Sequence, residues 1–72
     1  MPQASLKALL DSYRQQIDWL VLQAERLESG ERKITGHMRG QEIDLTANIA
    51  AEYRYKAGSL VAVIEAYERL HA

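Results

Sequence analysis

The side chains that could carry out catalysis or bind a metal are few in this sequence and stand far apart. The 72 residues include two histidines and no cysteine, so the chain offers neither a thiol nucleophile nor a thiolate metal ligand. His37 and His71 lack a spacing that would place both on one helical face as ligands. Catalysis needs a nucleophile, a base or a metal held in a cleft. We therefore expect a protein that is not an enzyme and that binds no cofactor and no metal.

Two other patterns have the form of a site but a simpler interpretation. Glu25 and Glu28 follow one another at helical spacing and could pair as carboxylates, although Arg26 and Arg32 nearby favour ordinary surface ion pairs. The segment 36–40 (GHMRG) has a glycine at each end but is too short for a phosphate-binding loop. Neither pattern changes the expectation of a non-enzymatic protein.

Basic residues gather only in the polar middle of the chain. Arg32, Lys33 and Arg39 are weak candidates for contacts with phosphate groups or with an acidic protein surface. Glu31 and Glu42 bracket them and reduce the local field, and the whole chain has a formal net charge of −1. A nucleic-acid-binding protein usually shows a basic face that displaces counterions. Weak nucleic-acid binding is therefore only the third expectation, and a solvated loop is the favoured interpretation.

Size and composition indicate that the chain depends on association with another chain. A domain this short buries a small share of its surface, and natural proteins of this size usually add disulfides, a metal or a second subunit. The sequence supports only the last of these, so we expect an oligomer. The longest apolar run, Trp19–Leu22, is far too short to span a bilayer, and the first residues lack the pattern of a secretory signal. We expect one soluble, cytoplasmic domain without membrane contact.

Apolar residues repeat at helical spacing over residues 5–29. The steps between them alternate between three and four, which places them on one stripe of a helix. Ser5 is suited to the N-cap, and Gly30 stands where a left-handed residue would end the helix. The stripe consists of Leu6, Leu10, Tyr13, Ile17, Leu20, Ala24 and Leu27.

A second helix is predicted over residues 45–71. Asp44 or Thr46 is suited to cap its start. Gly58 lies inside the pattern and destabilises the helix by about 1 kcal/mol relative to alanine, which tertiary packing must offset. The stripe consists of Ile49, Tyr53, Ala57, Leu60, Ile64 and Tyr67, with Val63 and Leu70 beside it.

The connection between the helices, residues 30–44, is polar and has two interpretations. A short β-hairpin would pair residues 33–35 with residues 41–43 and turn between Gly36 and Gly40. An irregular loop fits as well, because the runs are too short to show clear alternation. Either connection lets the helices fold back on each other. The expected fold class is all-α: a single domain over residues 1–72, an antiparallel two-helix hairpin that dimerises into a four-helix arrangement.

Large apolar residues outside the two stripes are candidates for partner contacts. At 100° per residue, Trp19 projects roughly 130° from the centre of its stripe, and Leu22 lies almost opposite that centre. Tyr55 also points away from its own stripe. Tryptophan is enriched at binding hot spots, so Trp19 and Leu22, with Tyr55 second, are the predicted anchors for a partner protein. The simpler alternative is that a dimer partner or the folded-over connection covers Trp19 and Leu22.

Small residues form a row on the outer side of the second predicted helix. Small side chains let another helix approach closely, so this row is the predicted dimer contact. The simpler explanation is the high helix propensity of alanine, although propensity would not select a glycine. The row consists of Ala47, Ala51, Gly58 and Ala62.

Two short patches resemble the quorum-sensing anti-activator family of Pseudomonas phages, small proteins that disarm host regulators by direct contact. One patch is residues 5–11 (SLKALLD), followed by a tryptophan-bearing helix, and the other is residues 57–62 (AGSLVA). The polar middle, residues 31–43, departs from that family. The resemblance implies a phage-encoded inhibitor that binds and occludes a regulatory protein in the host cytoplasm.

A second resemblance is to phage head–tail joining proteins, which place a β-hairpin between two helices. Residues 30–46 follow that order, although the second predicted helix is longer than this fold requires. This resemblance implies the alternative function, a structural adaptor in a larger assembly. Neither resemblance assigns functional residues.

Overall fold

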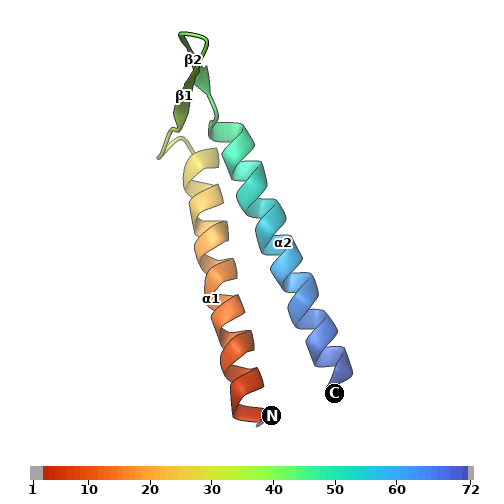
Figure 1. Cartoon of the computed structure of the whole chain (residues 1–72). Helices are drawn as coiled ribbons and strands as arrows, with labels where there is room; N and C mark the ends of the chain where they lie inside the picture. Colours follow the sequence, from red (N-terminus) through yellow and green to blue (C-terminus); the bar gives the residue numbers. More distant parts are fainter. Residues whose placement is uncertain (1–2, 72) are drawn as a thin grey trace.

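The protein is a long helical hairpin with a small β-hairpin at one end (Figure 1). The computed structural model describes residues 3–71. The helices are α1 (Gln3–Glu28) and α2 (Thr46–Leu70), and between them lie the strands β1 (Thr35–Met38) and β2 (Gln41–Asp44). The molecule measures 53 × 24 × 17 Å. The predicted antiparallel helical hairpin is confirmed for a single chain.

The ends of α1 confirm one sequence prediction and correct another. The helix begins at Gln3, so Ser5 lies within its first turn and is not the N-cap. Gly30 has a φ of +85°, the left-handed conformation expected at this position. The Ser29 N–H donates to the Glu25 carbonyl at 2.9 Å, and the Gly30 N–H donates to the Leu27 carbonyl at 3.3 Å. These bonds satisfy carbonyl groups in the last turn of α1.

The start of α2 is fixed by a polar cluster that differs from either predicted cap. Leu45 occupies the N-cap position and makes no side-chain cap bond. Asp44 lies one residue earlier and accepts a hydrogen bond from the Thr46 backbone N–H at 2.9 Å. The Thr46 hydroxyl instead accepts from the Ile34 N–H at 3.0 Å and lies 3.3 Å from the Ile34 carbonyl. Thr46 therefore joins the first turn of α2 to the connection rather than capping the helix.

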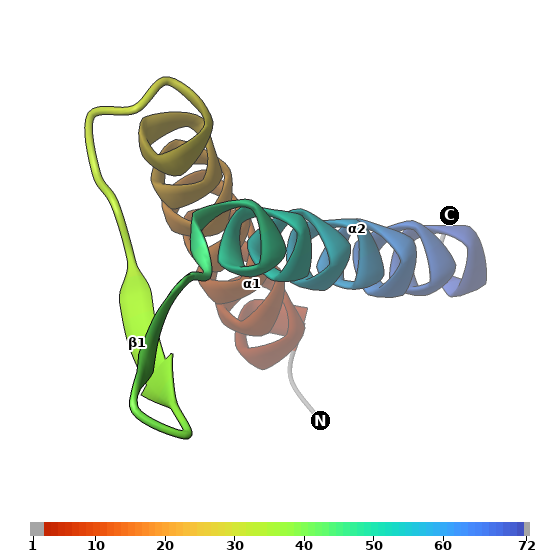
Figure 2. The ribbon, with the colours of Figure 1, turned by 90° about the horizontal axis from the view of Figure 1, so that it is seen from above.

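The connection forms the β-hairpin, with a register that differs from the predicted one. Thr35 pairs with Asp44 and Met38 pairs with Gln41, so the strands extend to a tight turn at Arg39 and Gly40. Both turn residues have positive φ, 54° and 78°, as a type I′ turn requires. The predicted pairing of residues 33–35 with 41–43 is therefore wrong. Seen from above, the β-hairpin lies to one side of the helices (Figure 2).

The seam between the helices combines three buried alanines with larger side chains. The predicted stripe of α1 is confirmed: its members are buried or half-buried. On α2, Ala50 is buried and Ile49 only half-buried, because the contacting positions follow a seven-residue repeat from Ala50 to Ala57 and Ile64. The buried residues are Leu20, Gln23, Ala24 and Leu27 of α1 with Ala50, Ala57 and Ile64 of α2.

The helices lie close together near the β-hairpin and separate toward their other ends (Figures 1 and 2). Alanines at positions 24, 50 and 57 permit the close approach at the hairpin end. Farther along, stripe residues such as Leu10 and Tyr67 are only half-buried. The single chain therefore covers its apolar stripes well at one end and incompletely at the other.

Candidate interaction surface

A mainly apolar groove of about 610 Å³ lies between the two helices, midway along the molecule. We call it the central groove. Leu20 is buried and Leu60 is half-buried, so these two side chains connect the groove to the core. The residues that line it include Gln16, Trp19 and Leu20 of α1 and Lys56, Ser59 and Leu60 of α2. Its chemistry suits an apolar side chain, because its lining surface is mainly apolar.

Trp19 stands at the wall of the central groove and not on the outer side of α1. Its ring lies 5.7 Å from the ring of Tyr53, centroid to centroid, with an angle of 71° between the planes. This edge-to-face contact joins α1 to α2. Trp19 nevertheless keeps 53% of its surface exposed. The helical projection placed it too far from α2, because the long indole reaches back toward the seam.

The structure does not unite the three predicted partner anchors into one surface. Leu22 and Tyr55 are exposed, at 44% and 77%. Leu22 projects from α1 almost directly away from α2, and Tyr55 projects from α2 almost directly away from α1. They therefore lie on opposite outer sides of the hairpin, and only Trp19 contributes to the central groove.

The predicted row of small residues is an exposed face of α2 on the other side of the seam. In the described part of the chain, no atom beyond its own helix lies within 4 Å of the position a Cβ would take on Gly58. Ala47 and Ala51 line a second hollow of about 630 Å³, together with Leu27 and Glu28. Ala62 is exposed as well. Among residues 3–71, none covers Gly58 at the centre of this row.

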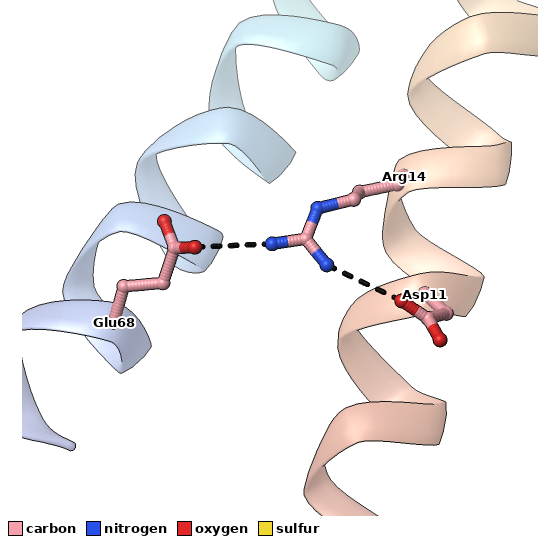
Figure 3. A network of polar contacts seen from close by, with 3 residues as sticks. All are labelled: Asp11, Arg14 and Glu68. Atoms are coloured by element: carbon pink, nitrogen blue, oxygen red, sulfur yellow. Dashed lines mark hydrogen bonds and ion pairs between the residues drawn. The ribbon is translucent and has the colours of Figure 1, made fainter. Parts of the chain in front are cut away.

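Charged side chains on the same side as that row are paired between the helices. Arg14 donates to Glu68 at 3.0 Å and to Asp11 at 3.3 Å (Figure 3). Arg54 donates two hydrogen bonds to Glu28. The hydrogen bonds from Arg54 and its positive charge hold the pKa of the Glu28 carboxyl below its usual value. These exposed pairs select the alignment of the helices more than they stabilise them.

The three basic candidates of the connection do not form one anion site. Arg32 donates to the side-chain oxygen of Gln23 at 2.6 Å. The Nζ of Lys33 lies 4.0 Å from a carboxylate oxygen of Asp44. Arg39 is exposed in the turn between the strands. Each basic group therefore has a separate environment, and the first two already face polar partners.

Gln23 is a structural residue that the sequence pattern did not indicate. It is buried, with 6% of its surface exposed, and its side-chain oxygen accepts the Arg32 bond. This bond fastens the segment that follows α1 to the side of that helix. Polar residues are common on helices, so no local signal marks this one.

The described residues contain neither a cluster suited to a metal ion nor a membrane-spanning helix. In the part of the chain from residue 3 to residue 71, no three His, Cys, Asp or Glu side chains are grouped to hold a metal ion. Over the same range, neither helix combines the length and apolarity needed to cross a membrane.

Comparisons with protein-family models, with curated proteins and with solved structures gave no match to this chain.

Proposed function

We propose that this chain is a non-enzymatic protein-interaction module that acts as a homodimer and inhibits a regulatory protein by occluding part of its surface. The observation that supports it is the large surface left by the single hairpin. The chain exposes 5600 Å². A compact monomer of its mass exposes roughly 4,500 Å². The difference is of the order that a stable interface removes from one partner, roughly 800 Å².

The extended shape supports the same proposal. The Cα radius of gyration is 16.4 Å, whereas a compact chain of this length has a radius of about 11 Å. An elongated hairpin offers long faces for other helices, and it needs no reactive group to block a partner's surface. Inhibition would therefore be steric, and its strength would depend on a few large apolar anchors.

The homodimer leaves outer positions for the regulatory protein. Leu22 and Tyr55 project away from the seam of the hairpin and are exposed. In this proposal they are the contacts for the inhibited protein, whereas Trp19 belongs to a groove that a second copy could cover. The proposed setting is the cytoplasm of a bacterial host, with the chain encoded by a phage.

The experiment is affinity capture from a lysate of the organism that carries the gene. The wild-type chain is compared with Leu22→Ala and Tyr55→Ala variants and with Ala66→Ser, a control at an exposed position of α2. We expect one protein to be enriched by the wild type and the control and to be reduced about tenfold or more by an anchor variant. Equal enrichment by all variants would show that the anchors are wrong. No enrichment by any of them would contradict an inhibitor of this kind.

The β-hairpin favours a second candidate function, a structural adaptor. An antiparallel two-stranded β-hairpin between two helices is the order found in phage head–tail joining proteins, and this chain has that order. An adaptor of this kind would assemble into a closed ring. Light scattering after size exclusion separates the two candidates, because a dimer supports the inhibitor and a larger ring supports the adaptor.

A further inference from the structure

We infer that the central groove is the interface between the two copies of the homodimer. A second copy of this chain lies across the groove, and each Trp19 enters the groove of the other copy. The two copies are related by a two-fold axis, so the same face serves both partners. The inference rests on the proposed self-association and adds to it the face, the axis and the anchor. It also assigns the row of small residues to the outside of the dimer.

The separation of the helices creates a need for apolar cover at this face. Leu60, a stripe residue that lines the groove, is only half-buried. Leu9, Trp19 and Val63 are exposed, at 38%, 53% and 38%, and helical spacing places all three on the side of the central groove. Burying such side chains stabilises an association by roughly 1.5–3 kcal/mol each when burial is complete. The face therefore gains more from a partner than the opposite face does.

The position of the groove suits a second copy. Its α1 residues, which run from Ser12 to Leu20, lie within the middle third of a helix that runs from Gln3 to Glu28. Its α2 residues, Lys56 to Leu60, occupy the middle of a helix that runs from Thr46 to Leu70. A two-fold axis through the centre lets two elongated hairpins overlap along most of their length. Such overlap forms the four-helix arrangement that the spacing of apolar residues predicts.

The shapes at the groove are complementary to themselves. Trp19 forms part of the wall and keeps 53% of its surface exposed, and the hollow beside it has a volume of about 610 Å³. An indole that enters this hollow would contact Leu20 and Leu60 of the other copy, and its own exposed surface would be covered at the same time. A face that offers both an exposed indole surface and the cavity satisfies the requirement of an isologous interface.

The charge of the groove face allows two identical surfaces to meet. Lys56 is the charged residue among those that line the groove, and its Nζ lies 3.5 Å from a carboxylate oxygen of Glu52 on the same helix. The remaining lining residues are uncharged. On the other side of the seam, charged pairs such as Arg14 with Glu68 occupy the surface. Charges are depleted in the centres of interfaces, so the groove face is the better candidate for the dimer interface.

The test measures dimer dissociation for two matched substitutions on α2. Ser59→Arg adds a positive charge at the groove, where the two-fold axis brings it near its counterpart. Ala62→Arg adds the same group to the row of small residues, and both positions are exposed in the single chain. Sedimentation equilibrium should show a dimer whose Kd rises by about tenfold or more in Ser59→Arg, because like charges oppose each other across the axis. We expect the Kd of Ala62→Arg to stay within about twofold of the wild type, because position 62 lies outside the proposed dimer interface.

Trp19 supplies a second, independent measurement, because it is the single tryptophan of the chain. In the wild-type dimer its fluorescence should be blue-shifted and protected from acrylamide. Dilution below the Kd, or the Ser59→Arg substitution, should shift the emission to the red while the helical circular dichroism is retained. Retention of helicity distinguishes dissociation from unfolding.

Three outcomes would overturn the inference, and they differ in what they imply for the proposed function. If Ala62→Arg dissociates the dimer and Ser59→Arg does not, the dimer interface lies on the row of small residues. The proposal of a homodimer would then still hold. A dimer with an exposed Trp19 would exclude the indole as the anchor. A strict monomer with an exposed Trp19 would remove the homodimer as well, and capture of a regulatory protein would then be judged on the lysate experiment alone.

Discussion

Arg54 donates two hydrogen bonds to the Glu28 carboxylate, from its Nε at 3.0 Å and from its Nη2 at 2.7 Å. These bonds join the last turn of α1 to α2. The planar guanidinium matches both oxygens of the carboxylate, which makes this pair more directional than a single bond. Both side chains remain nearly half exposed. The pair therefore acts mainly on the alignment of the two helices at the end where they lie closest.

The first prediction concerns acid sensitivity. The Arg54 bonds and charge lower the pKa of Glu28 below its ordinary 4.5, and the Thr46 hydroxyl and backbone N–H lower that of Asp44 below 3.8. A carboxyl whose folded pKa is depressed stabilises the fold above its unfolded pKa, and this contribution is lost as the pH falls through the folded pKa. We expect the thermal midpoint to be level near neutral pH and to decline from about pH 5 downward.

Glu28→Gln tests this prediction, and Glu65→Gln, at an exposed position of α2, is the control. Glu28→Gln should lower the midpoint at pH 7 and flatten its decline in acid, whereas Glu65→Gln should follow the wild type. High salt should reduce the difference at pH 7, because exposed charges are screened. Parallel acid profiles for all three proteins would contradict the assignment to Glu28.

The second prediction concerns Thr46, whose hydroxyl bonds the backbone of Ile34. Thr46→Val keeps the shape of the side chain and removes both bonds. A half-buried N–H left without a partner destabilises a fold by about 1–3 kcal/mol, so urea unfolding should show a loss in that range. The Ile34 amide should also exchange its hydrogen faster. Thr46→Ser retains the hydroxyl and should retain slow exchange, and equal exchange in Val and Ser variants would show that the bond has no such role.

The third prediction concerns the turn of the β-hairpin, where Arg39 has a φ of +54°. A left-handed conformation is unfavourable for an ordinary L-residue by roughly 1–2 kcal/mol, and asparagine adopts it more readily. Arg39→Asn creates the Asn-Gly pair preferred in type I′ turns and should raise the free energy of unfolding by a fraction of that amount. Thermal unfolding measures the change. Arg39→Val should have the opposite effect, and a Val variant as stable as the Asn variant would contradict the turn geometry.

The helical hairpin could be predicted from sequence because its determinants are local and periodic. Apolar steps of three and four define a stripe whatever the partner, and the stripe of α1 was correct from Leu6 to Leu27. The strand register could not be predicted in the same way. Its turn uses an arginine with positive φ, which local preferences disfavour. The register also continues into a bond from the Leu45 N–H to the Ile34 carbonyl, a contact that depends on where α2 begins.

The candidate surface was predicted only in part, because helical spacing gives the direction of a side chain and not its reach. Trp19 was identified, but its contact with Tyr53 brings it to the seam. The central groove itself depends on how far the helices separate, which is a property of their packing. The bond between Arg32 and Gln23 likewise joins two positions whose proximity follows from the path of the connection.

The fourth prediction uses Gly58 to examine the row of small residues. Of the atoms in residues 3–71, none beyond its own helix lies within 4 Å of the position that a Cβ would take, so alanine fits there without displacing a described neighbour. Glycine within a helix is less favourable than alanine by about 0.5–1 kcal/mol. Gly58→Ala should therefore raise the free energy of unfolding by that amount, measured in urea at a fixed protein concentration, and leave the dimer Kd unchanged. Ala51→Gly, on the same exposed row, is the matched reverse substitution and should lower stability by a similar amount.

If the row were a tight contact between copies, the added methyl group of Gly58→Ala would instead weaken the dimer, because closely packed helices do not accommodate an extra atom at their nearest approach. A rise in the dimer Kd with no gain in the free energy of unfolding would thus favour the row of small residues over the central groove as the dimer interface.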